Sequence, residues 1–179
     1  MNNSQVNSDD MILEERWQKV QKIVNKSFPK ICFGFGYGSG VLTQPNYNYN
    51  SNDFPMIDFI LVVDDVKLWL EQNYELNRNH YSGLSKMLGP GYSYWLTKNL
   101  FPMAFYPNIN LEDPDAADKQ NSNIPIKYGI ISKQDFLRDL KGWEFFSVCG
   151  RLHKPVRFFE LDKNDNEVQT DLYNNLISA

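Results

Sequence analysis

The sequence predicts an α/β (α+β) fold in which helices flank a mixed β-sheet. Residues 31–37 alternate apolar side chains with small ones, as a strand does, and residues 56–63, MIDFILVV, form the apolar run of a strand covered on both faces. Apolar residues at helical spacing precede, separate and follow these strands. The 179 residues show neither an internal repeat nor the regular period of a barrel, so a mixed sheet flanked by helices is expected.

The composition suits one domain, or one domain with a fragment of a second, because 42% of the residues are hydrophobic. The net charge is only -4 and the basic residues are dispersed, so no nucleic-acid partner is expected. Cys32 and Cys149 are too few and too far apart for a disulfide framework or a zinc site, which favours a reducing compartment. The longest apolar stretch is far shorter than the roughly 20 residues of a membrane span.

The first half of the chain gives the clearest strand and helix signals. Leu13, Trp17 and Val20 predict a helix over residues 10–26, capped by Asp9 or Asp10. After the strand at residues 31–37 comes the turn Gly38-Ser39-Gly40, and residues 44–54 have a loop composition. The expected elements that follow are the strand at 56–63, a helix over 66–74 capped by Asp64 or Asp65, and an aromatic-rich helical or irregular segment over 80–106.

The second half begins with a polar, acidic stretch at residues 108–125, where we expect a surface excursion without chemistry. A strand is expected over 126–131, followed by a helix that Ser132 caps and that continues to about residue 148. A basic cluster after Gly150 then leads into another strand. The sequence finally predicts a turn over 162–167 and a helix over 168–177.

Gly38-Ser39-Gly40 could approach phosphate oxygens, because small residues after a strand leave backbone N–H groups uncovered. Such turns are common, so the triplet alone is weak. Asp58 strengthens the signal, since an ionised carboxylate in an apolar strand is costly unless it is paired or binds a metal. A buried ion pair or a capping contact would also satisfy it. Together, the turn and the acid suggest the arrangement of nucleotidyltransferases, in which the turn holds a triphosphate and the acid holds Mg²⁺.

A second metal ligand is not evident. Many such enzymes carry a second acid two residues after the first, but Ile60 occupies that position here. Asp64 shares the face of Asp58 but lies about 20 Å farther along an extended strand. The open candidates are Asp53, Asp139, Glu144, or substrate phosphate and water.

Several other side chains could contact phosphate or a nucleotide. Arg151, His153, Lys154 and Arg157 form a basic cluster around Pro155, which could equally be a solvated turn. Lys127 is expected at a strand edge from which it could reach phosphate. The segment His80-Tyr81-Ser82 could donate or accept hydrogen bonds. A serine hydrolase is disfavoured, because Ser39 is outside a G-x-S-x-G turn and neither histidine has an obvious orienting acid.

The ordered segments FGYGSGV, MIDFILVVDD, HYSGL, IKYGIIS, the helix with Asp139 and Trp143, and GRLHKPV resemble the mitochondrial translocator assembly and maintenance family. The family consists of phosphatidate cytidylyltransferases, and the resemblance runs from residue 28 to residue 158. It implies a nucleotidyltransferase fold over residues 28–161, an N-terminal helix packed on it over 1–27, and the start of a truncated helical, winged-helix-like domain over 162–179.

The resemblance also implies that CTP and phosphatidic acid give CDP-diacylglycerol and pyrophosphate with Mg²⁺, feeding cardiolipin synthesis. It places the protein peripherally on the matrix side of the mitochondrial inner membrane and leaves a homodimer possible. By matching segments, Asp58 would bind the metal and act in catalysis with Lys127 and Lys154. The nucleotide would be bound by Gly38, Ser39, Gly40, His80, Tyr81, Ser82 and Arg151.

Two departures from the family pattern leave alternatives open. The chain ends at Ala179, where family members continue through a second domain and a membrane-binding region, and residues 100–125 are unusually acidic and proline-rich. The alternatives are a nucleotidyltransferase with another acceptor and a truncated, non-enzymatic assembly factor. The aromatic residues Tyr92, Tyr94, Trp95 and Phe101 could face a lipid or a partner, although such spacing more often fills a core.

Overall fold

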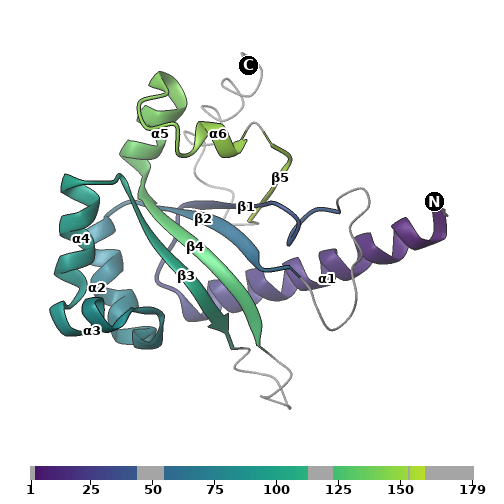
Figure 1. Cartoon of the computed structure of the whole chain (residues 1–179), viewed down its shortest axis with the longest axis horizontal. Coiled ribbons are helices and arrows are strands. Elements are labelled where there is room, and N and C mark those ends of the chain that lie inside the picture. Colours follow the sequence, from purple (N-terminus) through teal and green to yellow (C-terminus); the bar gives the residue numbers. More distant parts are fainter. Residues whose placement is uncertain (1–2, 44–54, 113–122, 153, 160–179) are drawn as a thin grey trace.

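A five-stranded mixed sheet forms the centre of the structure (Figure 1). The computed structural model describes residues 3–43, 55–112, 123–152 and 154–159. The strands are β1 (Phe33–Tyr37), β2 (Ile57–Val63), β3 (Met103–Leu111), β4 (Ile124–Ser132) and β5 (Val156–Phe158). Their order in the sheet is β3-β4-β2-β1-β5. β2 and β4 are parallel and the other neighbours are antiparallel, which confirms the predicted mixed sheet.

Helix α1 (Asn3–Ser27) runs along one face of the sheet (Figure 1). Trp17, Val20 and Val24 are buried there among apolar side chains of β2, so the predicted spacing is confirmed. The helix begins before the predicted residue 10. Asp9 and Asp10 therefore lie inside it, and the expectation that one of them caps its start was wrong.

Helix α2 (Val66–Leu76) begins where the sequence predicts, because the Asp65 side chain accepts a hydrogen bond from the Leu68 amide at 3.0 Å. The segment that the sequence left undefined contains a 3₁₀ turn, η1 (Arg78–His80), and two helices, α3 (Gly83–Leu88) and α4 (Pro90–Asn99). These elements pack beside α2 and lead into the edge strand β3 (Figure 1).

The hairpin of β3 and β4 corrects the prediction of an excursion over residues 108–125. Residues 108–111 belong to β3 and residues 124–125 belong to β4. A bulge between Tyr106 and Ile109, with Asn108 at φ 56°, interrupts the apolar alternation that marks a strand. Lys127 is also not at a strand edge as expected, because β4 lies between β3 and β2.

Helix α5 (Lys133–Gly142) starts at the predicted cap, since the Ser132 hydroxyl accepts the Asp135 amide at 3.0 Å. The prediction that it continues to residue 148 was wrong. The chain leaves the helix at Trp143, which has φ 52°. The short helix α6 (Cys149–Leu152) follows and leads towards β5. Cys32 and Cys149 are free cysteines, and Cys149 is buried.

Two apolar clusters cover the two faces of the sheet. We call the face covered by α1 and α2 the α1 face, and the one covered by α5 and α6 the α5 face. In β2, Phe59 and Leu61 point to the α1 face, while Ile60 and Val62 point to the α5 face. This confirms a central strand covered on both faces.

Among the described helices, none is long and apolar enough to cross a membrane. The loop predicted over 44–54, and the turn and helix predicted over 162–177, lie outside the described residues.

Candidate functional site

Asp58 lies on the α5 face of the sheet, at the N-terminal end of β2. Strand alternation places it on the same side as Ile60, and its side chain is half-buried. The register of the sheet puts Tyr37 of β1 beside Asp58 on one side and Lys127 of β4 on the other. The three residues therefore form a row across three adjacent strands.

Two cations act on the Asp58 carboxylate. Burial raises the pKa of Asp58, and the positive charges of Lys127 and Arg151 partly offset this by lowering it. Burial is the larger effect, so the pKa of Asp58 stays above its usual range. A bound cation would add the stabilisation that the carboxylate lacks, whereas an ion pair alone leaves its desolvation incompletely offset.

Arg151 comes from α6 and is held by two aromatic rings. Its guanidinium carbon lies 5.5 Å from the centre of the Tyr37 ring and 5.4 Å from that of Phe105. Its Nη1 also donates a hydrogen bond to the Ser147 carbonyl oxygen. Stacking and hydrogen bonding fix the guanidinium group next to the row, which suits a contact to phosphate.

The turn Gly38-Ser39-Gly40 lies against the beginning of β2. Gly38 has φ +82°, a conformation that favours glycine, and its carbonyl oxygen accepts the amides of Val41 and Leu42 at 3.2 Å each. A Cβ atom on Gly40 would lie 2.3 Å from the carbonyl oxygen of Met56. Only glycine therefore permits this approach, which brings the turn within two residues of Asp58.

The fold therefore places Lys127 of β4 and Arg151 of α6 next to Asp58 of β2, and it places Gly40, in the turn after β1, against the start of β2. Lys154 belongs to the turn that follows α6, where its amide donates to the Arg151 carbonyl oxygen at 3.1 Å. Its side chain is exposed. His153, which the sequence grouped with these cations, lies outside the described residues.

His80 and Tyr81 lie on the α1 face, across the sheet from Asp58. His80 Nδ1 is 3.0 Å from the hydroxyl oxygen of Tyr128, the residue next to Lys127 that points to the opposite face. The Tyr81 hydroxyl donates to the carbonyl oxygen of Leu70 at 3.0 Å. Both residues are buried. They lie apart from the row of Asp58, but both line a cavity that Phe105 also lines, and their contact with the nucleotide stays a prediction.

Ser82 is also separated from the row. It caps α3 and is exposed, and its hydroxyl donates to the Ser85 hydroxyl at 3.3 Å. The sequence grouped it with His80 and Tyr81 because the three are consecutive. Only the folded chain shows that this segment and Asp58 lie on different faces of the sheet.

A sequence model of a protein family, described as phosphatidate cytidylyltransferase, mitochondrial, matches residues 11–179. The chain belongs to this family. A protein of that name from Schizosaccharomyces pombe is 37% identical over 166 residues, covering 93% of this chain and 38% of the relative. Its counterpart in Xenopus laevis is 35% identical over 158 residues, covering 85% of this chain and 42% of the relative. The human protein is 31% identical, covering 93% of this chain and 34% of the relative.

The chain spans about two fifths of the length of these curated relatives of the mitochondrial phosphatidate cytidylyltransferase family. Family membership confirms the resemblance that the ordered segments indicate. The relatives do not assign roles to individual residues here, so the site rests on the geometry of the described side chains.

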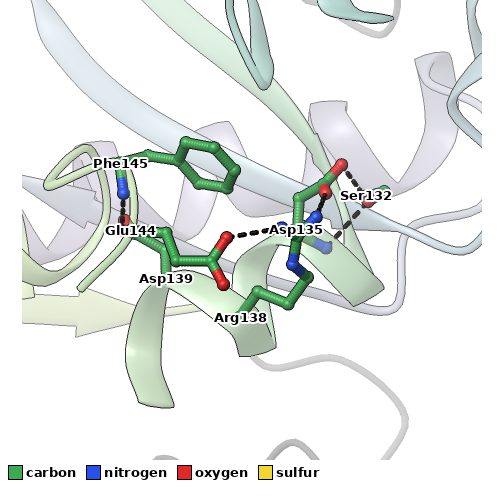
Figure 2. Close-up of polar contacts among 6 residues, drawn as sticks. All are labelled: Ser132, Asp135, Arg138, Asp139, Glu144 and Phe145. Atoms are coloured by element: carbon green, nitrogen blue, oxygen red, sulfur yellow. Dashed lines mark hydrogen bonds and ion pairs between the residues drawn. The ribbon is translucent and has the colours of Figure 1, made fainter. Parts of the chain in front are cut away.

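Two of the proposed further metal ligands have structural roles. Asp139 of α5 is fully buried, and one of its carboxylate oxygens accepts the amide of Phe145 at 2.7 Å (Figure 2). Its other carboxylate oxygen accepts the amide of Val148 at 2.7 Å. Glu144 is bound by Arg138 at 2.5 Å. Asp53 lies outside the described residues. Within the described segments, no group of three or more His, Cys, Asp or Glu side chains could hold a metal.

Tyr37 and Phe105 are the site residues that the sequence analysis missed. The alternation of residues 31–37 predicts the face on which Tyr37 lies, and its position before Gly38 is a usable signal. Phe105 gives no comparable signal, because the segment around it was undefined. Its contact with Arg151 depends on how β3 and α6 are placed in space.

Proposed function

We propose that this chain carries the nucleotidyl-transfer site of a phosphatidate cytidylyltransferase, which converts CTP and phosphatidic acid into CDP-diacylglycerol and pyrophosphate. The observation that carries the proposal is the row of Tyr37, Asp58 and Lys127, with Arg151 beside it and the Gly38–Gly40 turn adjoining it. Family membership and the names of the relatives support the choice of substrates.

The residues present fit a bound Mg²⁺ ion. Asp58 supplies one hard oxygen ligand, and its carboxylate is incompletely compensated by the neighbouring cations. Mg²⁺ commonly takes only one or two protein carboxylates and completes its shell with water and phosphate oxygens, so a second acid on β2 is not needed. When bound, the ion would withdraw negative charge from the triphosphate.

The proposed reaction is an in-line displacement at the α-phosphorus of CTP. A phosphate oxygen of phosphatidic acid forms the new bond to that phosphorus, and the bond to the bridging oxygen of the β-phosphate breaks. The electron pair leaves with pyrophosphate. Phosphatidic acid is already an anion near neutral pH, so no strong base is required and the site must chiefly align the reactants and offset their charges.

The chain's own residues have distinct roles in this scheme. The Gly38–Gly40 turn would bind the triphosphate through backbone N–H groups, and Arg151 and Lys127 would offset the charge that develops on the leaving pyrophosphate. Lys154 could extend the basic surface from the same turn as Arg151. Peripheral contact with the matrix side of the mitochondrial inner membrane, a supply of product for cardiolipin, and a homodimer belong to the same proposal.

The first test is pyrophosphate release from CTP by the purified chain with Mg²⁺ and phosphatidate vesicles, beside Asp58→Asn and beside ATP, GTP and UTP. We expect release that depends on both CTP and phosphatidate and that falls by roughly 100-fold or more in the variant. Normal turnover by Asp58→Asn would refute the metal assignment. Equal use of another acceptor in place of phosphatidate would refute the lipid assignment, and absence of both release and CTP binding would favour the non-enzymatic alternative.

A further inference from the structure

A cavity of about 760 Å³ follows the edge strand β3, between that strand and the segment of η1, α3 and α4. One section is lined by apolar side chains from the end of α4 and the start of β3, namely Leu96, Phe101, Pro102, Met103 and Phe105. The opposite section is lined by residues of η1, α3 and α4 and of the turns between them, namely Asn79, His80, Tyr81, Ser82, Ser85 and Ser93. None of the described residues that line the cavity is a Lys, Arg, Asp or Glu.

The apolar section adjoins the candidate site. Phe105 lines the cavity, and its ring is the one that lies 5.4 Å from the Arg151 guanidinium. Ser147, which also lines the cavity, accepts a hydrogen bond from Arg151 through its carbonyl oxygen. A single molecule with an anionic group at Arg151 and a hydrocarbon part along Phe105 would therefore contact both regions.

Two aromatic side chains of the apolar section are exposed to solvent. Phe101 is 65% exposed and Phe105 is 42% exposed, although both side chains are fully apolar. The sequence favoured a core position for Phe101 and Trp95, but Trp95 is also exposed, at 53%. An apolar surface of this kind commonly marks a binding site for a partner or a lipid.

A second polypeptide strand is a poor fit to this edge. The bulge between Tyr106 and Ile109 breaks the ladder, Pro107 has no N–H group to donate, and Asn108 has a left-handed conformation. These features are typical of edges that resist strand addition. The phosphates of a nucleotide also fit poorly inside the cavity, because its described lining has no Lys or Arg. Neither objection applies to a hydrocarbon chain, which needs no strand to pair with and no cation.

We propose that the apolar section of this cavity binds an acyl chain of the acceptor phosphatidate, while its phosphate group lies at Arg151 and Lys127. The inference rests on the proposed function and assigns the lipid part of that site. In this proposal Phe105 contacts both Arg151 and the acyl chain. One face of its ring holds Arg151 towards the reacting phosphates, and its position in the cavity wall guides the chain away from them.

The test uses phosphatidate with a photoactivatable diazirine in one acyl chain, carried in phosphatidylcholine vesicles and mixed with the whole chain. After illumination, peptide mass spectrometry locates the cross-links. We expect them at residues 96–105, and we expect excess unlabelled phosphatidate to suppress them while added phosphatidylcholine does not. Cross-links spread evenly over all exposed apolar surfaces would overturn the proposal.

Phe101→Ser is the sharpest variant, because the exposed position of Phe101 leaves the folded core intact. We expect cross-linking to fall by about fivefold, as suits the loss of one partly covered aromatic contact. Phe146→Ser is the matched control, since Phe146 is 67% exposed but does not line the cavity. Equal cross-linking by the two variants would contradict the assignment.

Cross-linking requires neither CTP nor turnover, so it separates this inference from the proposed function. Cross-links at residues 96–105 without CDP-diacylglycerol formation would support the lipid site and refute the transfer reaction. Product formation with cross-links elsewhere would refute the lipid site alone. If residues 96–105 give no lipid cross-link but become protected from hydrogen exchange as the protein concentration rises, a second copy covers the cavity and the proposal is overturned.

Discussion

At the scale of a single residue, the ionised carboxyl of Asp58 lowers the stability of the folded protein. Burial raises the pKa of Asp58 despite the nearby cations Lys127 and Arg151. The folded chain therefore holds a proton on this carboxyl more tightly than the unfolded chain does. Its contribution to stability falls as the pH rises through the raised pKa, and the ionised form is the less favourable one at neutral pH.

Asp58→Asn should consequently leave the ligand-free protein as stable as the wild type at pH 7.5, or more stable. The difference should narrow as the pH is lowered to about 3, where the carboxyl is mostly protonated in both states. Thermal melting at several pH values measures this. Mg²⁺ with CTP should raise the melting temperature of the wild type only. A variant that is clearly less stable without ligands would mean that Asp58 has a structural role.

A substitution at Gly40 tests whether the turn must lie close to the start of β2, next to Asp58. Gly40→Ala would place a Cβ atom 2.3 Å from the Met56 carbonyl oxygen, so the turn must move or the strand must shift. We expect a loss of about 1–3 kcal/mol in the free energy of unfolding, together with weaker CTP binding. Urea unfolding and nucleotide titration measure the two effects.

Gly91→Ala is the control for that substitution. Gly91 is an exposed position in α4, and nothing lies within 4 Å of a Cβ built there. Alanine in a helix should stabilise the protein by about 0.5–1 kcal/mol without affecting nucleotide binding. Similar losses from both alanine variants would show that the contact at Met56 is unimportant.

At the scale of an element, the connection between α5 and α6 positions a residue of the candidate site. Asp139 accepts the amide of Phe145 (Figure 2) and that of Val148, and these hydrogen bonds shape the loop that leads to Arg151. Arg151 in turn donates to the carbonyl oxygen of Ser147 in that loop. A buried carboxylate without contact to the candidate site therefore positions one of the site's cations.

Asp139→Ala should lower the free energy of unfolding by about 3 kcal/mol, because it removes hydrogen bonds to a charged group and leaves amide donors unsatisfied. It should also weaken CTP binding, since Arg151 loses its support. Glu144→Ala is the comparison, because the Glu144–Arg138 ion pair is exposed and should contribute less than about 1 kcal/mol. Urea unfolding of both variants decides whether the loop depends on Asp139.

At the scale of the whole molecule, a buried polar network ties the helices of the α1 face to the sheet. Asn73 of α2 donates to the hydroxyl oxygens of Tyr81 at 3.3 Å and of Tyr128 at 3.2 Å. His80 meets the Tyr128 hydroxyl at 3.0 Å, and burial lowers the pKa of His80 from 6.5 to about 4. The network joins α2 and η1 to β4, the strand that carries Lys127 on its other face.

The depressed pKa of His80 predicts how the fold responds to acid. Between pH 6.5 and about 4, the unfolded chain binds a proton at His80 that the folded chain does not. Stability from this group is therefore present above the unfolded pKa and is lost as the pH falls towards the folded value. The wild type should lose stability relative to His80→Gln over this interval.

The comparison of wild type with His80→Gln cancels the carboxylates that titrate in the same range, because both proteins share them. Chemical unfolding at pH 4, 5, 6 and 7 measures the difference. A constant difference across this range would show that His80 carries the same charge in the folded and unfolded states.

The sequence by itself determined the central strands and the starts of α2 and α5, and it singled out Gly38–Gly40, Asp58, Lys127 and Arg151 as candidates. These signals are local: alternation, caps and glycine turns depend on neighbours a few positions away. It could not place the hairpin of β3 and β4, because a bulge breaks the alternation. It also missed the end of α5, after which Asp139 accepts the amides of Phe145 and Val148.

Tertiary structure decided which of the candidate residues meet. Register across β1, β2 and β4 brings Asp58 to Tyr37 and Lys127, and the packing of α6 on the sheet brings Arg151 to Phe105. The packing of η1 beside α2 puts His80 and Tyr81 on the opposite face, although their segment resembles the family as well as the others do. Sequence spacing carries no information about the face of a sheet that a separate helix covers. Contacts between residues far apart in the chain fix that face.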